Sequence, residues 1–250
     1  MPNFRSITQV GTSEPFELQV ARGQIPGHKH VFKFGVNPSV QNVEETVWEG
    51  GGLYVYPSSA VTMTVASASG ATDNGVIITI SGLDSDYNEQ SETVTLAGSG
   101  TATTTKSFLR VNRGFVVGPQ APVGSVTVAN GGVTYAYING DNQTLMAVWT
   151  IPAGYEGFIT RLDVTVLTEQ NNKFGNIRLV TKEQGGVFRT QETFSVEQGP
   201  ISLAYSIPIR IPEKTDIEYR AIASSSQANL RVSAAFELIY IKREDWTNGS

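Results

Sequence analysis

The stretch VWEGGGLYVYPSSAVTMTVAS, residues 47–67, joins one tryptophan, three consecutive glycines and two tyrosines to a run of alternating residues. In that run Val61, Met63 and Val65 fall on one face and two threonines on the other, which is the period of a β-strand with one buried face. The same period continues through the rest of the chain and decides the fold class.

The three glycines are Gly50, Gly51 and Gly52. They are not a phosphate-binding loop of the Walker type, because no Lys-Ser or Lys-Thr follows them. We expect them to bend the backbone through positive φ angles or a tight turn, so that the neighbouring aromatic side chains can pack. The predicted interface or glycan-stacking candidates are Trp48, Tyr54 and Tyr56. A core or subunit interface is the commoner place for such rings, and a sugar platform is the alternative.

Alternation between apolar and polar residues recurs along the chain. VTVANGGVTYAYI (126–138) and NIRLVTKEQGGVFRTQETF (176–194) each contain two such runs separated by a Gly-Gly turn, which predicts hairpins. The longest run, Leu230 to Tyr240, keeps its apolar residues in phase to the end. We therefore predict an all-β chain of two β-sandwich domains, the C-terminal one jelly-roll-like.

The segment GPQAPVGS, residues 118–125, has two prolines and two glycines near the middle of the chain. Such composition favours a linker. The predicted organisation is an extended N-terminal arm and first strand over 1–40, an N-terminal sandwich over 41–118, a linker over 119–124 and a C-terminal sandwich over 125–250.

Composition excludes several classes of protein. The formal net charge is −5, which is opposite to the basic stripe of a nucleic-acid groove. The chain has no cysteine, so neither a disulfide framework nor a thiolate metal site exists. No apolar run is long enough to cross a membrane, and the first ten residues lack the apolar region of a signal peptide. We expect no nucleic-acid or membrane partner and no cofactor.

Two weak metal candidates remain. His28 and His30, the only histidines, would share one face of a strand, but no acidic residue follows them within residues 31–36. Asp84, Asp86 and Asn88 have the spacing that opens a calcium loop, but the glycine and glutamate that an EF-hand loop needs later are missing. We therefore predict no metal. Carboxylates are scattered and no Gly-x-Ser-x-Gly motif occurs, so we expect no enzyme.

Three stretches resemble a known group of proteins. They are KFGVNPSVQNVEETVWEGGGLYVYP (33–57), ITISGLDSDYNEQSETVTLAGSGTATTTKSFLRVNRGFVV (78–117) and GDNQTLMAVWTIPAGYEGFITRLDVTV (140–166). Together they resemble virion structural proteins of tailed bacteriophages, especially podovirus-like phages of marine bacteria and cyanobacteria. The resemblance implies a virion component assembled in the host cytoplasm, and no functional residue is carried over from it.

The function expected from the resemblance and the composition is a capsid decoration, or cement, protein on the capsid surface. It would bind the major capsid protein and act as a homo-oligomer, with a trimer expected from the placement of such proteins on three-fold axes. The alternative is a tail or fibre component that binds a host receptor or surface glycan.

Overall fold

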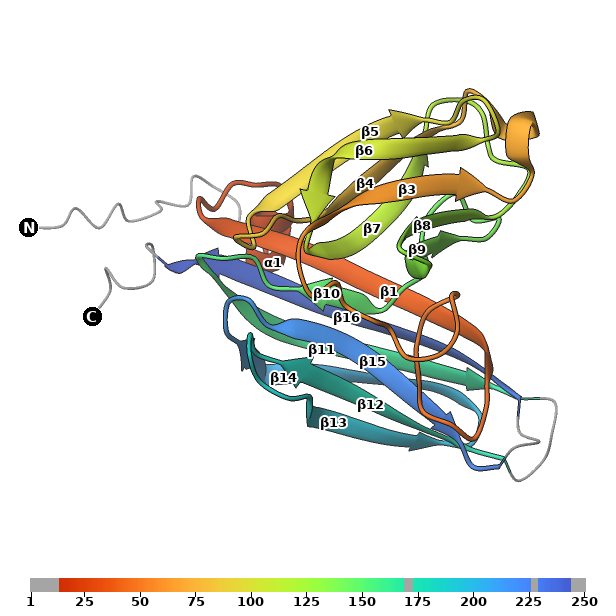
Figure 1. The fold of residues 1–250 in the computed structure, drawn as a ribbon. Helices are drawn as coiled ribbons and strands as arrows, with labels where there is room; N and C mark the ends of the chain where they lie inside the picture. The colour runs from red at the N-terminus through yellow and green to blue at the C-terminus, as the bar shows by residue number, and fades with distance from the viewer. Residues whose placement is uncertain (1–13, 169–172, 226–228, 244–250) are drawn as a thin grey trace, which may run out of the picture.

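The computed structural model describes residues 14–168, 173–225 and 229–243 (Figure 1). It confirms the all-β prediction, because strands in antiparallel sheets form nearly all of the regular structure. The exceptions are a short helix, α1 (Phe16–Ala21), and a single 3₁₀ turn, η1 (Gly70–Asp73).

The lower half of Figure 1 is a jelly roll of two facing four-stranded layers. Its strands in chain order are β1 (His28–Val40), β10 (Val148–Thr150), β11 (Tyr155–Leu167), β12 (Gly175–Lys182), β13 (Arg189–Val196), β14 (Gly199–Ile211), β15 (Asp216–Ala223) and β16 (Leu230–Lys242). One layer has the order β1-β16-β11-β14 and the other β10-β15-β12-β13, to which the short β2 (Glu45–Thr46) adds by pairing with β15. This order is that of two interleaved Greek keys, as in jelly rolls, so that part of the prediction is confirmed.

The upper half of Figure 1 is a second sandwich, inserted in the chain between β1 and β10. Its strands are β3 (Val61–Ser67), β4 (Ile77–Leu83), β5 (Glu89–Thr95), β6 (Thr101–Phe108), β7 (Arg110–Val117), β8 (Val126–Asn130) and β9 (Val133–Ile138). They form sheets of order β6-β3-β8-β9 and β5-β4-β7. We call this unit the inserted sandwich.

The division of the chain differs from the one expected at residues 119–124. That segment joins β7 to β8, and β8 pairs with β3, so it lies within the inserted sandwich. Its backbone is held in place, since the Asp73 carboxylate accepts the N–H groups of Val123 at 2.7 Å and Gly124 at 3.0 Å. Proline and glycine mark a turn here, and turn composition alone does not separate a fixed turn from a linker.

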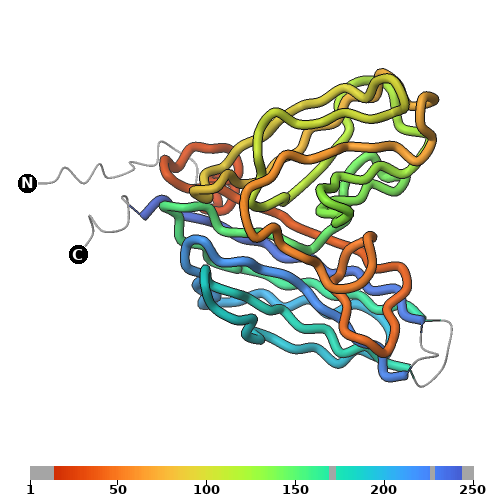
Figure 2. The backbone as a smooth tube through the Cα atoms, in the orientation of Figure 1, coloured from red at the N-terminus to blue at the C-terminus, as the bar shows by residue number. Residues whose placement is uncertain are grey.

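The first strand, β1, also differs from the expectation, because it belongs to the jelly roll and not to an extended N-terminal arm. Residues 1–13 of the predicted arm lie outside the described residues. The next part forms α1, and β1 then pairs antiparallel with the last strand, β16, over most of its length (Figure 2). β1 and β16 pair residues that are at least 190 positions apart in the sequence (Val40 with Leu230), so local composition does not predict this contact.

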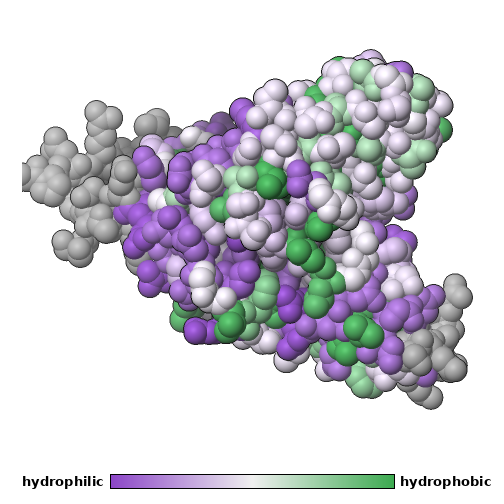
Figure 3. Space-filling model, viewed as in Figure 1, coloured by the Kyte–Doolittle hydropathy of each residue, from purple (hydrophilic) through white to green (hydrophobic). Residues whose placement is uncertain are grey.

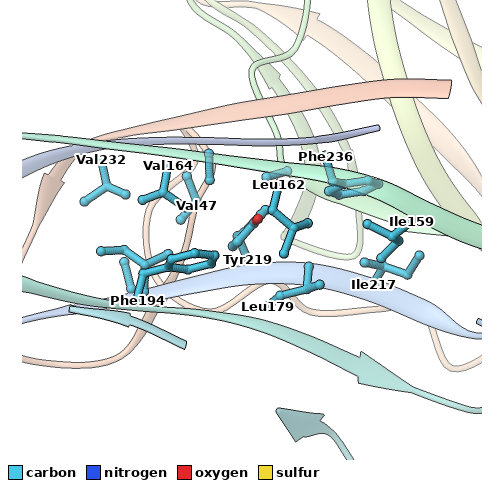
Figure 4. Packing of buried hydrophobic residues seen from close by; sticks show 14 of the residues in the cluster. Val47, Ile159, Leu162, Val164, Leu179, Phe194, Ile217, Tyr219, Val232 and Phe236 are labelled. Atoms are coloured by element: carbon cyan, nitrogen blue, oxygen red, sulfur yellow. The ribbon is translucent and has the colours of Figure 1, made fainter. Parts of the chain in front are cut away.

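Each half has its own hydrophobic core. In the jelly roll, the alternating apolar residues of β16 from Leu230 to Tyr240 face inward, and the Phe236 ring lies near that of Tyr219 in the opposite layer (Figure 4). The inserted sandwich has a separate core that includes Met63, Ile78 and Phe108. The site described below lies where the two halves meet.

Candidate functional site

A buried ion pair connects the two sandwiches. Arg110, at the start of β7, donates from Nε to Oδ1 of Asp216 on β15 at 2.7 Å and from Nη2 to Oδ2 at 3.0 Å. The two side chains are 8% and 1% exposed. Thr150 donates to the same Oδ1 at 2.7 Å, and Lys182 lies 3.5 Å from Oδ2. The carboxylate is thus held by groups from two other strands of the jelly roll, β10 and β12, and by one arginine of the inserted sandwich.

A second carboxylate, Glu218, follows two residues later on the same face of β15 and is fully buried. It pairs with Arg220, and it accepts hydrogen bonds from Thr46 Oγ1 and the Tyr56 hydroxyl, each at 3.4 Å. Burial raises the pKa of Glu218 to about 7, partly offset by Arg220. The outer face of an antiparallel sheet is usually exposed to water. Here the chain that leads into the inserted sandwich covers the face that carries Asp216 and Glu218.

Cations and rings alternate across the junction. The series is Tyr87, Arg110, Tyr56, Lys182, Phe188 and Arg220. The Arg110 guanidinium lies 4.9 Å from the Tyr56 ring and 5.3 Å from the Tyr87 ring, and the Arg220 guanidinium lies 4.1 Å from Phe188. Contacts of this kind stabilise most when they are shielded from water, as Arg110 is.

A hollow of about 630 Å³ opens beside this series and is lined by Tyr56, Arg110, Lys182 and several serines. The N–H groups of Arg110 already form hydrogen bonds within the protein, so none is available to a ligand in this hollow. Its Nη1 donates to the carbonyls of Pro57 and Leu109, and its Nη2 also reaches the Tyr87 hydroxyl at 3.3 Å. Arg110 and Asp216 are therefore used in holding the two sandwiches together, while Glu218 is held by Arg220, Thr46 and Tyr56.

The three glycines lie at the edge of this junction. Gly51 and Gly52 have φ angles of +70° and +65°, in the left-handed region that favours glycine. Their carbonyls accept the Trp48 indole N–H at 3.0 and 3.2 Å. Glycine is needed at position 50 for lack of space, because a Cβ there would lie 2.4 Å from the Trp48 ring. The loop folds back over its own tryptophan.

The aromatic candidates are core residues of the junction. Trp48 and Tyr54 are 4% and 5% exposed, and their rings meet edge-to-face with centroids 5.2 Å apart. The Tyr54 hydroxyl points at the carbonyls of Val111 and Tyr135 in the inserted sandwich, at 3.3 and 3.1 Å. Neither ring offers a face to a sugar or to another subunit, and only Tyr56 reaches the hollow.

We expect Gly51→Val to lower the free energy of unfolding by about 1–2 kcal/mol, because a residue with a Cβ is strained at this positive φ. Nothing lies within 4 Å of the added Cβ, so strain is the main cost. Urea denaturation measures the change. Ser58→Val, an exposed position in the same connection, is the control, and equal stability of the two variants would contradict the prediction.

A second prediction concerns pH. Because the folded-state pKa of Glu218 lies above its ordinary value of 4.5, folding favours the protonated acid. Its contribution to stability is therefore greatest below about pH 4.5 and is lost as the pH rises through about 7. We expect Glu218→Gln to be more stable than the wild type at pH 8 and to have a flatter stability profile between these values. Glu183→Gln, in an exposed turn, should follow the wild-type profile, and a parallel profile for Glu218→Gln would refute the prediction.

The side chains of His28 and His30 are not placed to bind one metal ion together. His28 Nδ1 lies 3.0 Å from the Pro26 carbonyl, and its ring meets Phe16 edge-on at 5.9 Å. His30 is exposed on β1. In the described part of the chain, no group of three or more acidic or histidine side chains is placed to hold a metal ion.

The acidic loop closes on itself. Asp84 Oδ1 accepts the backbone N–H groups of Asp86 at 2.8 Å and Asn88 at 2.9 Å, and Asn88 also donates its amide to Asp84 Oδ2 at 3.3 Å. These bonds form the turn between β4 and β5. Tyr87, at the tip, has a φ of +67°, and its carbonyl accepts the N–H of Ala153 at 2.9 Å. The loop thus positions Tyr87 beside Arg110.

Comparisons with known proteins give no family. No protein-family model matches the chain, and no curated protein matches it. Among solved structures, the chain is similar to infectious bursal disease virus, Gx strain, at 12% identity and a TM-score of 0.26, over 86% of this chain and 72% of that one. The D431N mutant VP2 protein of the same virus, in T=1 particles, matches at 14% identity and a TM-score of 0.22, over 94% and 80%.

A third solved structure is the Yersinia pseudotuberculosis-derived mitogen, at 12% identity and a TM-score of 0.21, over 36% of this chain and 80% of that one. TM-scores of this size fall below those of a shared fold, so the architecture is described from this chain's own sheets. No helix among the described residues is long and apolar enough to cross a membrane.

Proposed function

We propose that this chain is a non-enzymatic structural protein of a bacteriophage virion, a capsid decoration protein that binds the major capsid protein and strengthens its lattice. The observation that carries the proposal is the junction between the sandwiches. Its buried acids, Asp216 and Glu218, are fully used in internal ion pairs and hydrogen bonds. Such a network fixes the relative position of two β units, which suits a clamp better than a catalyst.

The jelly-roll topology is compatible with this function. Jelly rolls occur in viral capsid proteins and also in lectins and cupins, and a fold alone does not determine a function. The three stretches that resemble phage virion proteins favour the first of these classes. The chain has few charges and no cysteine, so contacts between subunits would depend on apolar patches and sheet edges.

The surface offers candidate contacts of that kind. In Figure 3 apolar side chains appear as separate small groups among hydrophilic ones. The most exposed large apolar side chain among the described residues is Ile207, at 83%, on the edge strand β14, and residues 199–209 of that strand carry no charge. We propose that surfaces of this kind join copies of the protein to one another, as a trimer, and to the capsid.

The copy number in purified virions tests the proposal. A capsid decoration protein should be present in hundreds of copies, and a tail or fibre component in a handful. In addition, particles that lack the protein should release their DNA at a lower temperature, and adding the purified protein back should restore the wild-type temperature. A handful of copies with no effect on particle stability would overturn the capsid role in favour of a tail or fibre component.

A further inference from the structure

Two adjoining hollows lie in the crevice between the sandwiches, on the side of β1, and among the described residues they share no lining residue with the hollow at the ion-pair junction. Their volumes are about 480 and 470 Å³, and Ser81 and Trp149 line both. Each hollow is large enough for one sugar ring with its substituents. The pair forms a site that neither the composition nor the proposed capsid role accounts for.

Aromatic side chains form one wall of the second hollow. Phe32 is 44% exposed, and Phe34, Phe115 and Trp149 are half-buried. The Phe32 and Phe34 rings lie 5.7 Å apart and are tilted by 30°. The negative face of an aromatic ring attracts the polarised C–H groups on one side of a sugar, so half-exposed rings beside polar groups are suited to bind carbohydrate.

The same crevice contains two basic side chains without a partner acid. Arg113 lines the second hollow and donates to the Phe32 carbonyl at 3.1 Å. Lys33 is 1% exposed, donates to the Asn112 carbonyl, and lies 5.8 Å from the Trp149 ring centre. Neither Lys33 nor Arg113 forms an ion pair within the described ranges, although the chain as a whole is acidic. Burial, and to a lesser extent the nearby Arg113, holds the pKa of Lys33 well below its ordinary value, so Arg113 is the charge that an anionic group in the crevice would pair with.

Two buried polar atoms in the first hollow's wall also have no partner. They are Oδ1 of Asn112, a residue that is 3% exposed, and the indole N–H of Trp149. Most buried polar groups in proteins form a hydrogen bond, so two orphans in one wall indicate a place where a polar molecule binds. Glu89 and Gln90 line the same hollow but are engaged within the protein, Glu89 with Lys29 and the Tyr240 hydroxyl and Gln90 with the Ser107 carbonyl.

We propose that this crevice binds an acidic saccharide, a uronic or sialic acid within an oligosaccharide. The carboxylate would pair with Arg113, the sugar faces would lie against Trp149 and Phe115, and hydroxyl groups would reach Asn112. The inference goes beyond the capsid role and does not depend on it, because a surface protein at any position in a virion can bind host glycans.

Titration calorimetry of the full chain with oligogalacturonate, oligoglucuronate and sialyllactose, beside neutral lactose and cellobiose, tests the proposal. At least one acidic saccharide should bind saturably, more tightly than either neutral one, and more weakly as salt increases. In a ¹⁵N spectrum, the Trp149 indole signal, assigned with Trp149→Phe, should shift on binding. No binding by any acidic saccharide, or equal binding of neutral ones, would overturn the proposal.

Arg113→Gln is the decisive variant. Loss of a charged hydrogen bond should weaken binding by about tenfold or more. Arg161→Gln is the matched control, because Arg161 is a half-exposed arginine on β11 that pairs with Asp163. Both variants should melt as the wild type does. Unchanged affinity in Arg113→Gln, or an equal loss in both variants, would show that the crevice does not bind the carboxylate.

Discussion

Arg110→Ala should lower the free energy of unfolding by about 3–5 kcal/mol, because removing one member of a buried ion pair leaves the other charge without compensation. The charge left behind is that of Asp216, which is 1% exposed. Thr150 and Lys182 remain near it, at 2.7 and 3.5 Å, but they do not replace the two parallel hydrogen bonds of the guanidinium. The loss also removes the cation between the Tyr56 and Tyr87 rings.

Urea denaturation at neutral pH measures this effect. Arg161→Ala is the control, because its pair with Asp163 is exposed to water, and such pairs contribute about 1 kcal/mol or less. A double variant, Arg110→Met with Asp216→Leu, should recover much of the stability, since no charge is then buried alone. If Arg110→Ala is no more destabilising than Arg161→Ala, the ion pair does not hold the sandwiches together.

The sequence predicts those parts of the fold that depend on neighbouring residues. The Gly-Gly turn at residues 131–132 joins the paired strands β8 and β9, and the second such turn lies between the paired strands β12 and β13. The in-phase apolar residues of β16, from Leu230 to Tyr240, face the core as their alternation predicts. In the two hairpins the signal and the contact lie within about twenty residues, and in β16 the alternation itself spans a single strand.

Contacts between distant residues account for what the sequence does not predict. Arg110 and Asp216 are 106 residues apart, and nothing near either one indicates its partner. The local pattern around Asp216 is misleading. In Asp-Ile-Glu-Tyr-Arg, residues 216–220, charged residues alternate with apolar ones, as they do on a strand with one face in water. The inserted sandwich covers that face, and a single sequence does not reveal what covers a strand.

Phe236→Ala should also lower the free energy of unfolding by about 3–5 kcal/mol, through lost burial and the cavity left in the jelly-roll core. Phe236 is fully buried on β16 between the two layers, with its ring 6.3 Å from that of Tyr219 (Figure 4). Phe174→Ala, at a position that is 42% exposed, should change stability by only about 0.5 kcal/mol.

The matching change in the other core, Phe108→Ala, distinguishes one cooperative unit from two. The chain enters and leaves the inserted sandwich close to β1: Ala147 N–H donates to the Val47 carbonyl at 2.9 Å, and a Cβ on Gly35 would lie 2.2 Å from the Ala147 nitrogen. With these contacts and the Arg110–Asp216 pair, neither half can unfold without exposing groups that the other half buries. Phe236→Ala and Phe108→Ala should therefore each shift the same single calorimetric transition. Two transitions, each sensitive to only one variant, would mean that the sandwiches unfold independently and that the junction does not couple them.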